Sequence, residues 1–413
     1  MLAGGGDYRP LAQAGPAQSQ CARDVAQVER GHRAVVVHRE QRPVREAGRG
    51  RGMQRDAIRV GHRAATEAAH WRERVAAEEV ELGQRHQLVH RDPVAAAEER
   101  VGGIDLLLRL THAGTRIVHV RHARVGPPDA PVVVVAGGIS ADRHATGWWG
   151  AQVGPGCAID TRHVQVLAID WLGSDGALDV PLDPADQADA IAALLDALGI
   201  DALNAFVGCS YGAQVGLQFA ARHGSRLRQL IAISGVHRAH PYASAWRALQ
   251  RRAVALGALQ CDDAHGLALA RQLAVLSYRT PEEFDGRFGE AVVTDGRVRV
   301  DAEDYLDHCA DRYVARTPVA AFLRLSESID LQAVDPERIK VPTTVVAVAD
   351  DRLVPVVQAY ELVERLRGET RLHVLRSRYG HDAFLKEHAA IAALLGDVLH
   401  AAPADAARRG VAA

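Results

Sequence analysis

The sequence predicts an α/β protein built on a mostly parallel β-sheet, and three observations support this. Short runs of branched apolar residues at 131–136, 164–170 and 343–349 have the composition of buried parallel strands. Stretches with helical periodicity alternate with these runs, as in βαβ units. A further run at 205–207 leads into Gly-Cys-Ser-Tyr-Gly, which is typical of a tight turn between a strand and a helix.

The predicted elements follow one another from about residue 115. The run 115–120 alternates apolar and polar residues, as a half-buried strand does. A helix is expected over 187–199, where Gly199 supplies the C-terminal cap. The Gly-Cys-Ser-Tyr-Gly turn then leads into a helix at 213–220 and a strand at 230–234.

The alternation breaks after this strand. Residues 237–330 are mostly helical, with 245–254 as the clearest helix, and the strand pattern returns at Val341. A block of helices inserted between two strands forms a lid over the edge of the sheet. A deep pocket under such a lid suits a substrate that must be shielded from water.

Ser210 is the candidate nucleophile. It stands at the apex of the turn, with Gly208 and Gly212 two residues to either side. Small neighbours allow the chain to fold back sharply and to hold the central residue in a strained conformation, which exposes its hydroxyl. Glycine and serine are also common in ordinary loops, so the motif needs partners before it indicates catalysis.

The candidate partners of the serine lie further along the chain. A serine hydroxyl needs a histidine base and a carboxylate that orients the histidine, and with this turn they follow in the order serine, acid, histidine. Asp350 and Asp351 come directly after one predicted strand, and His381 comes after the next. Loops after parallel strands lie at one edge of the sheet, so we expect these groups beside Ser210.

Acyl transfer also needs fixed donors for the negative oxygen of its tetrahedral intermediate. The backbone N–H of Tyr211, the residue after the nucleophile, is the expected first donor. The strand at 131–136 runs into Gly137 and Gly138, and we expect the N–H of Ile139 to be the second donor. The alternative is that the glycine pair only makes a turn.

Residues 1–114 differ from the rest of the chain. They are rich in Arg, Ala, Gly, His and Gln, with little apolar periodicity. Such a segment buries too little apolar surface to offset its chain entropy, so we expect a disordered extension or a start assigned too far upstream. A nucleic-acid-binding arm is the remaining interpretation. The expected organisation is a 1–114 extension, an α/β core in two parts at 115–236 and 331–400, a lid at 237–330 and a tail at 401–413.

The composition of the chain argues against several other classes of protein. The chain has 413 residues, 48% of them apolar, and a net charge of −2, so it has an ample core and no overall field that favours nucleic acid. Its five cysteines are scattered, which indicates neither a metal site nor a disulfide framework, and Cys209 is expected to be a buried structural thiol. No signal peptide or membrane-spanning run is recognised, so we expect a cytoplasmic protein without a membrane partner.

Several motifs together resemble the homoserine O-acyltransferase family of α/β-hydrolase-fold enzymes. The similarity covers roughly the last three quarters of the chain and omits its N-terminal part. The matching pieces are 138–140 with 144–145, 147–149, 153–156 with 159–161, 277–280, 284–288 and 380–385. The family spacing to Leu353 and Pro355 favours Asp351 as the acid, and Asp350 is then a capping residue.

The resemblance implies that an acyl group moves from acyl-CoA to the serine and then to the hydroxyl of homoserine. Ser210 is then the nucleophile, His381 the general base and acid, and Asp351 its orienting partner. Arg251 on a lid helix matches the family arginine that binds the amino acid carboxylate, and Asp382 matches the residue that binds its ammonium group. The alternative interpretations are that Arg251 lies on a solvated helix face and that Asp382 only caps a loop. The resemblance also implies no bound cofactor, acyl-CoA as co-substrate, and a homodimer that meets through the lid helices.

Two departures from the family pattern bear on the substrates. Tyr211 and Ala213 stand where many members have other residues, which indicates a subtype rather than lost activity. Arg143 stands in the oxyanion loop where a small residue is usual, and we hypothesise that it binds the free carboxylate of a succinyl donor; a surface arginine is the alternative. Succinyl-CoA and homoserine are thus the expected substrates, in methionine biosynthesis. The alternatives are acetyl-CoA as donor, serine as acceptor, or an esterase.

Overall fold

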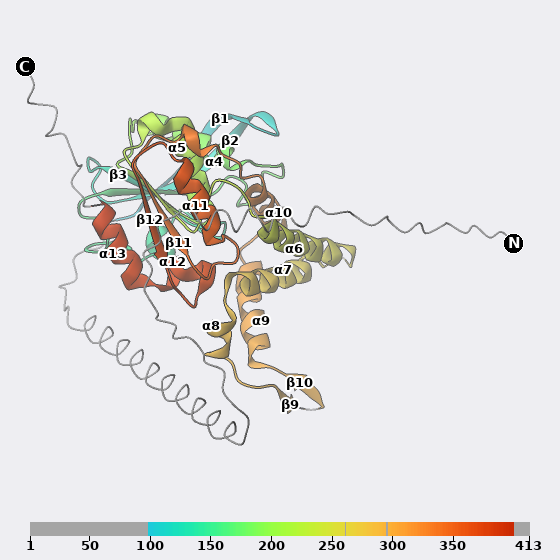
Figure 1. Cartoon of the computed structure of the whole chain (residues 1–413). Coiled ribbons are helices and arrows are strands. Elements are labelled where there is room, and N and C mark those ends of the chain that lie inside the picture. The colour runs from blue at the N-terminus through green and yellow to red at the C-terminus, as the bar shows by residue number, and fades with distance from the viewer. Residues whose placement is uncertain (1–97, 261, 295, 400–413) are drawn as a thin grey trace, which may run out of the picture. The chain divides into compact units, whose positions relative to one another are not determined.

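The structure is a computed structural model that describes residues 98–260, 262–294 and 296–399 (Figure 1). Its centre is a sheet of eight strands, β1 (Arg100–Leu110), β2 (Gly114–Val125), β3 (Val132–Ala136), β6 (Gln165–Ile169), β7 (Ala205–Cys209), β8 (Leu230–Ile233), β11 (Thr343–Val348) and β12 (Thr370–Leu375). Their order across the sheet is β1-β2-β6-β3-β7-β8-β11-β12. The pairs β1–β2 and β2–β6 are antiparallel and the others are parallel. The mostly parallel sheet confirms the predicted fold class.

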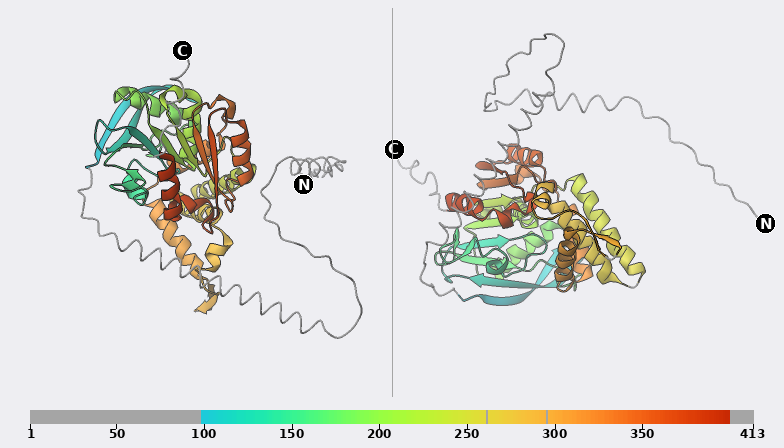
Figure 2. Two further views of the ribbon diagram at one scale, coloured as in Figure 1. Left: turned by 60° about the vertical axis from the view of Figure 1, so that its left-hand side comes forward. Right: turned by 90° about the horizontal axis from the view of Figure 1, so that it is seen from below.

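Helices cover both faces of the sheet (Figure 2). On one face lie α4 (Pro184–Ala197), α5 (Tyr211–His223) and α11 (Val356–Arg365), and on the other lies α13 (His388–Leu399). Strands β3, β6, β7, β8 and β11 are buried along their whole length. Because both of their faces meet helices, their sequences are continuous apolar runs.

Helix α4 shows how local sequence sets an element's bounds. It begins after Asp183, whose side chain accepts a hydrogen bond from the N–H of Ala185, while the Asp186 side chain accepts one from the N–H of Asp183. Gly199 follows the helix with φ +68°, which is the backbone conformation expected of a C-terminal glycine cap.

Strand β1 corrects the expected organisation. It pairs with β2 along its whole length, and its alternate apolar residues Ile104, Leu106, Leu108 and Leu110 face the core. Residues 100–114 therefore belong to the sheet and not to the extension that we expected over 1–114. This period-two alternation is a strand pattern that the sequence analysis overlooked. Residues 1–97 and 400–413 lie outside the described residues, so most of the expected extension and the whole of the expected tail at 401–413 are not described.

The lid is a separate layer of helices between β8 and β11 (Figures 1 and 2). It contains α6 (Pro241–Leu259), α7 (Asp263–Tyr278), α8 (Pro281–Asp285), α9 (Asp301–Val314) and α10 (Val319–Asp330), with a small hairpin of β9 (Val292–Thr294) and β10 (Arg297–Arg299). The lid has its own apolar core, made by Ala253, Val254, Leu267, Ala270, Tyr313 and Phe322. It is thus a packed unit rather than a loose loop.

Short elements complete the described part of the chain. They are α3 (Ala145–Trp148), α12 (Ala383–Lys386), the strand pair β4 (Val153–Gly154) and β5 (Ile159–Asp160), and the 3₁₀ turns Gly224–Arg226, Pro336–Arg338 and Gly380–Asp382. Within the described ranges, no helix is long and apolar enough to cross a membrane.

Candidate active site

Ser210 lies at the turn between β7 and α5. Its φ is +55°, in the left-handed region that non-glycine residues rarely adopt. A Cβ on Gly208 would lie 2.3 Å from the carbonyl oxygen of Gly212, and a Cβ on Gly212 would lie 2.1 Å from that of Ala136. Only glycine therefore fits at these two positions, and the turn has the strained geometry that the sequence predicts.

The structure brings Ser210, His381 and Asp351 together. The Oγ of Ser210 lies 2.8 Å from Nε2 of His381, and Nδ1 of His381 lies 2.7 Å from Oδ2 of Asp351. These residues follow β7, β12 and β11, so the carboxyl ends of three parallel strands deliver them to one edge. The arrangement is that of a nucleophile, its base and an orienting acid.

Asp351 is fixed from the side opposite the histidine. Its Oδ1 accepts hydrogen bonds from the N–H groups of Leu353 at 2.8 Å and Val354 at 2.9 Å. Burial by itself lowers the pKa of His381, but the charge of Asp351 and its hydrogen bond outweigh this effect, so the pKa is raised above its usual value. Asp350 has a capping contact instead, because its Oδ2 accepts from the N–H of Ser377.

The loop after β3 lies against the serine turn. The carbonyl oxygen of Gly137 accepts a hydrogen bond from the N–H of Gly212, and that of Gly138 accepts one from Nε1 of Trp171. Ile139 lines the same cavity as Ser210. This arrangement keeps the loop beside the nucleophile, where the N–H groups of Ile139 and Tyr211 remain our expected oxyanion donors.

The aromatic side chain of Tyr211 joins the turn to the lid. Its hydroxyl lies 2.7 Å from the hydroxyl of Ser328 on α10, and its ring packs edge-on against Trp171. Cys209, the residue before the serine, is buried, and burial raises the pKa of its thiol. A neutral buried thiol is not a nucleophile, which leaves the hydroxyl of Ser210 for that role.

A cavity of about 570 Å³ lies between the sheet edge and the lid, with Ser210 and His381 in its lining. Its cationic side chains are Arg238, Arg247, Arg271, Arg279, Arg312, Arg316 and Lys386. Asp382 is the one carboxylate among the described residues that line it. This positive lining favours an anionic ligand. Within the described ranges no cluster of His, Cys, Asp and Glu could hold a metal ion.

The two residues expected to bind the amino acid lie differently. Asp382 lines the cavity and pairs with Arg279, with 2.9 Å between Oδ2 and Nε. Arg251 is not in the lining; it donates to Oγ of Ser326 and pairs with Asp330. Arg247, one helical turn earlier on α6, lines the cavity instead and pairs with the same aspartate. Spacing of four residues puts both arginines on one helix face, so the sequence could not choose between them.

Arg143 lies away from the position that we expected. Its NH1 is 2.5 Å from Oδ2 of Asp170, its own backbone N–H donates to the same carboxylate, and it is absent from the cavity lining. The ion pair and the backbone hydrogen bond to Asp170 therefore hold Arg143 and the loop after β3 in place. The hypothesis that Arg143 binds a donor carboxylate is not supported by this geometry, whereas Arg247, Arg271 and Arg279, which the sequence analysis did not select, do reach the cavity.

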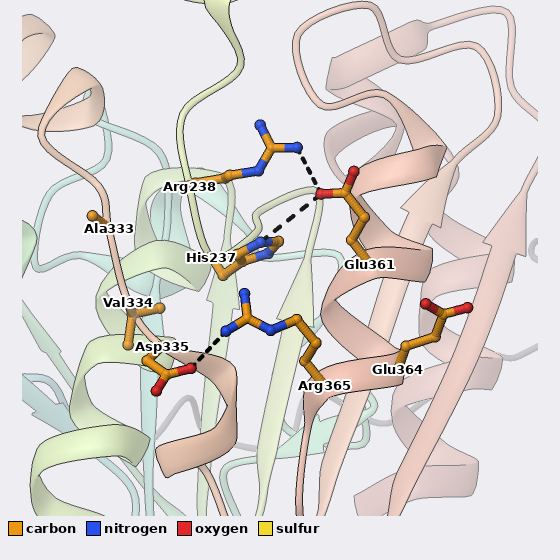
Figure 3. A pocket seen from close by; sticks show the side chains of 8 residues that line it. All are labelled: His237, Arg238, Ala333, Val334, Asp335, Glu361, Glu364 and Arg365. Carbon is orange, nitrogen blue, oxygen red and sulfur yellow. Dashed lines mark hydrogen bonds and ion pairs between the residues drawn. The ribbon is translucent and has the colours of Figure 1, made fainter. Parts of the chain in front are cut away.

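Arg238 also lines a second hollow, together with His237, Asp335, Glu361, Glu364 and Arg365 (Figure 3). There its NH2 lies 2.6 Å from Oε2 of Glu361, which also lies 4.0 Å from Nε2 of the buried His237. A further pair, Arg365 with Asp335, lies below them in Figure 3. Glu364 also lines this hollow, so its carboxylates outnumber its two arginines, and Arg238 is paired there with Glu361.

The sheet, the lid and the triad together define an α/β-hydrolase-fold enzyme. A family model described as "alpha/beta hydrolase fold" matches residues 131–388. The chain is 60% identical over 307 residues to a homoserine O-succinyltransferase of Xanthomonas campestris pv. campestris, covering 72% of this chain and 83% of that protein. It is 31% identical to a serine O-succinyltransferase of Frateuria aurantia, covering 69% of this chain and 93% of that one. The protein belongs to the homoserine O-acyltransferase family, as the sequence motifs predict.

Solved structures agree on the fold. A homoserine O-acetyltransferase from Bacillus anthracis superposes with a TM-score of 0.66 at 16% identity, over 73% of this chain and 98% of that one. The esterase E22 gives 0.66 at 19% identity, over 73% and 100%. Because transferases and esterases share this fold, the reaction has to be argued from the site.

Proposed function

We propose that this protein transfers a succinyl group from succinyl-CoA to the hydroxyl of L-homoserine through an acyl-enzyme on Ser210, a step of methionine biosynthesis. The observation that carries the proposal is a complete triad opening into a cavity whose lining, among the described residues, has seven cationic side chains and one carboxylate. The similarity to the homoserine O-succinyltransferase described above supports the choice of both substrates.

In the first half-reaction the acyl group moves from CoA to Ser210. His381 takes the proton of Ser210 at Nε2 while Oγ attacks the thioester carbonyl, and the N–H groups of Ile139 and Tyr211 stabilise the oxyanion. The intermediate then collapses, the carbon–sulfur bond breaks, and His381 returns the proton to the leaving CoA thiolate. Asp351 stabilises the imidazolium that exists between the two transfers.

Deacylation repeats these steps with a different nucleophile. The homoserine hydroxyl gives its proton to His381 and attacks the acyl-serine carbonyl. The bond from the acyl carbon to Oγ breaks, and His381 returns the proton to Ser210, which restores the enzyme. Transfer exceeds hydrolysis only if the acceptor occupies the cavity and excludes water, which the packed lid over the triad favours.

Arg247 and Asp382 form the acceptor seat that we propose. Both line the cavity with His381. The charge of Asp382 raises the pKa of His381 and the charge of Arg247 lowers it, so both lie close enough to act on the imidazole. A guanidinium suits the carboxylate of an amino acid and a carboxylate suits its ammonium group. Asp330 pairs with both Arg247 and Arg251. Because Arg251 is not in the cavity lining, we propose that it positions Asp330 and does not contact the acceptor.

Two substitutions test the reaction and the seat. Ser210→Ala should lower succinyl transfer by several orders of magnitude, because the acyl-enzyme cannot form. Arg247→Ala should raise the KM for homoserine on the order of 10- to 100-fold, as loss of a charge-assisted contact does. Arg251→Ala should have a smaller effect. Turnover retained by Ser210→Ala would contradict the mechanism, and a larger effect at Arg251 would return the seat to that residue.

The alternative substrates are separated in the same assay. Serine is one methylene shorter than homoserine, a difference that is typically worth only about 1–3 kcal/mol, so both acceptors should be compared with both CoA donors. Release of free acid without acceptor would indicate an esterase.

The homodimer that we propose meets through the lid. Leucines that are at least 43% exposed occur on α6 and α7, namely Leu249, Leu256, Leu259, Leu269 and Leu276. Light scattering after gel filtration should give twice the chain mass, and Leu256→Arg should shift the protein toward monomer. A monomer at all concentrations would contradict this interface.

A further inference from the structure

The cationic side chains of the cavity divide into two groups. Arg238, Arg247 and Arg279 already pair with protein carboxylates, with N–O distances of 2.6 to 2.9 Å. Among the described residues, Arg271, Arg312, Arg316 and Lys386 have no carboxylate within ion-pair distance. The second group therefore holds cationic charge that no carboxylate among the described residues neutralises.

Arg271 differs from the others in this group. Arg312, Arg316 and Lys386 are exposed, whereas Arg271 on α7 is only partly accessible. Its Nε is buried and has no hydrogen-bond partner within the described part of the chain. A buried donor without a partner is unfavourable, and an anion in the cavity would supply that partner.

Aromatic rings hold Arg271 in place. Its Cζ lies 4.8 Å from the ring centroid of the buried Tyr313 and 5.8 Å from that of Tyr278. Cation–π contacts of this kind orient a guanidinium but leave its N–H donors unused. Arg271 is therefore an oriented guanidinium fork in the lining of the cavity.

Tyr278 links this fork to the catalytic centre. Its ring centroid lies 5.9 Å from that of His381, and Cζ of Arg271 lies 5.8 Å from the centroid of the same ring. An acyl group on Ser210 starts beside His381, and its far end extends into the cavity. From this juxtaposition we infer that Arg271 binds the free carboxylate of a dicarboxylic acyl group and makes the enzyme select succinyl-CoA over acetyl-CoA.

This inference rests on the proposed function and assigns its donor specificity. An acetyl group has no second carboxylate, so it leaves Arg271 as it is in the free enzyme. A succinyl group brings an anion into the cavity, where a charge-assisted fork replaces the water that the anion loses. We expected Arg143 to bind the succinyl carboxylate from the sequence. In this inference Arg271, on lid helix α7, binds it instead.

Donor selectivity measures the effect of Arg271 directly. In Arg271→Met, kcat/KM for succinyl-CoA should fall on the order of 10- to 100-fold, while that for acetyl-CoA stays within about threefold. Arg271→Lys keeps the charge but loses the fork, and should lie between the wild type and Arg271→Met. Arg252→Met, an exposed arginine on α6, is the matched control and should leave both donors unchanged.

The phosphates of CoA are the other anions that Arg271 could meet, and the two donors separate these cases. An equal fall for both donors, or weaker binding of free CoA, would assign Arg271 to the phosphates and overturn the inference. Unchanged selectivity with normal activity would overturn it as well. Absence of transfer with either donor in the wild type would instead reject the proposed function. Thermal melting of each variant distinguishes these outcomes from misfolding.

Discussion

Asp351→Asn is the most direct test of how the triad works. The asparagine has the same shape, and its amide oxygen can keep the hydrogen bonds from Leu353 and Val354 that Oδ1 accepts at 2.8 and 2.9 Å. Its NH₂ group then faces Nδ1 of His381, at the 2.7 Å contact now made by Oδ2. The imidazole must accept there and carry its proton on Nε2, so it cannot take the proton of Ser210.

The size of this effect follows from the contacts. The same change in a serine-protease triad lowers kcat by about 10⁴, which corresponds to roughly 5 kcal/mol of transition-state stabilisation. The two backbone hydrogen bonds survive, so the free energy of unfolding should change by less than about 1 kcal/mol. We therefore expect a folded protein with a melting temperature close to the wild type and almost no turnover.

The pH profile gives a second readout. His381 must be neutral to act as a base, so kcat/KM of the wild type should fall as the pH drops through its raised pKa. In Asp351→Asn the charge that raises this pKa is gone while burial remains, so the acid limb should move to lower pH. Stopped-flow release of CoA measures acylation in both proteins.

The matched control is Asp350→Asn, because Asp350 only caps the loop through Ser377. It should keep nearly full activity and the wild-type acid limb. A loss of less than tenfold in Asp351→Asn, with an unmoved acid limb, would refute the assignment of Asp351. A large loss in Asp350→Asn instead would exchange the roles of the two aspartates.

Three further substitutions test the turn and its attachment to the lid. Gly212→Ala would place a Cβ 2.1 Å from the carbonyl oxygen of Ala136, so it should destabilise the fold by about 3 kcal/mol in urea unfolding. Gly396→Ala has open space within α13 and should stabilise it by about 0.5–1 kcal/mol; equal effects of the two alanines would show that the turn is not tightly packed. Tyr211→Phe leaves the hydroxyl of Ser328 without its partner and should cost about 1–3 kcal/mol, and an unchanged melting temperature would show that this contact does not stabilise the protein.

The strand and turn patterns predicted the site well because they depend on local sequence. Ser210, Asp351 and His381 come after apolar strands, and the loops that leave parallel strands lie at a single edge of the sheet. The same reasoning overlooked β1, although its apolar residues alternate as in a strand. Residues 1–114 were treated as one segment because most of it is rich in arginine and poor in apolar periodicity.

The arginines show the limit of this approach. A cluster on α6 contains both Arg247 and Arg251, and the helical period puts them on one face. Which of them reaches the cavity depends on how the lid packs and on where Asp330 lies. Arg143 was close to the oxyanion loop in sequence, yet Asp170 holds its guanidinium away from the cavity.

The amino-acid sequence alone determined the α/β sheet, the strained serine turn and the order of its partners, because each arises from periodicity or from residues a few positions apart. Only the tertiary structure decided which cations line the cavity and which of them pair with carboxylates. An arginine side chain is long and flexible, so its direction is set by the carboxylates and aromatic rings that distant segments bring near it. For Arg271 these are Tyr278 on its own helix and Tyr313, which the fold brings from α9.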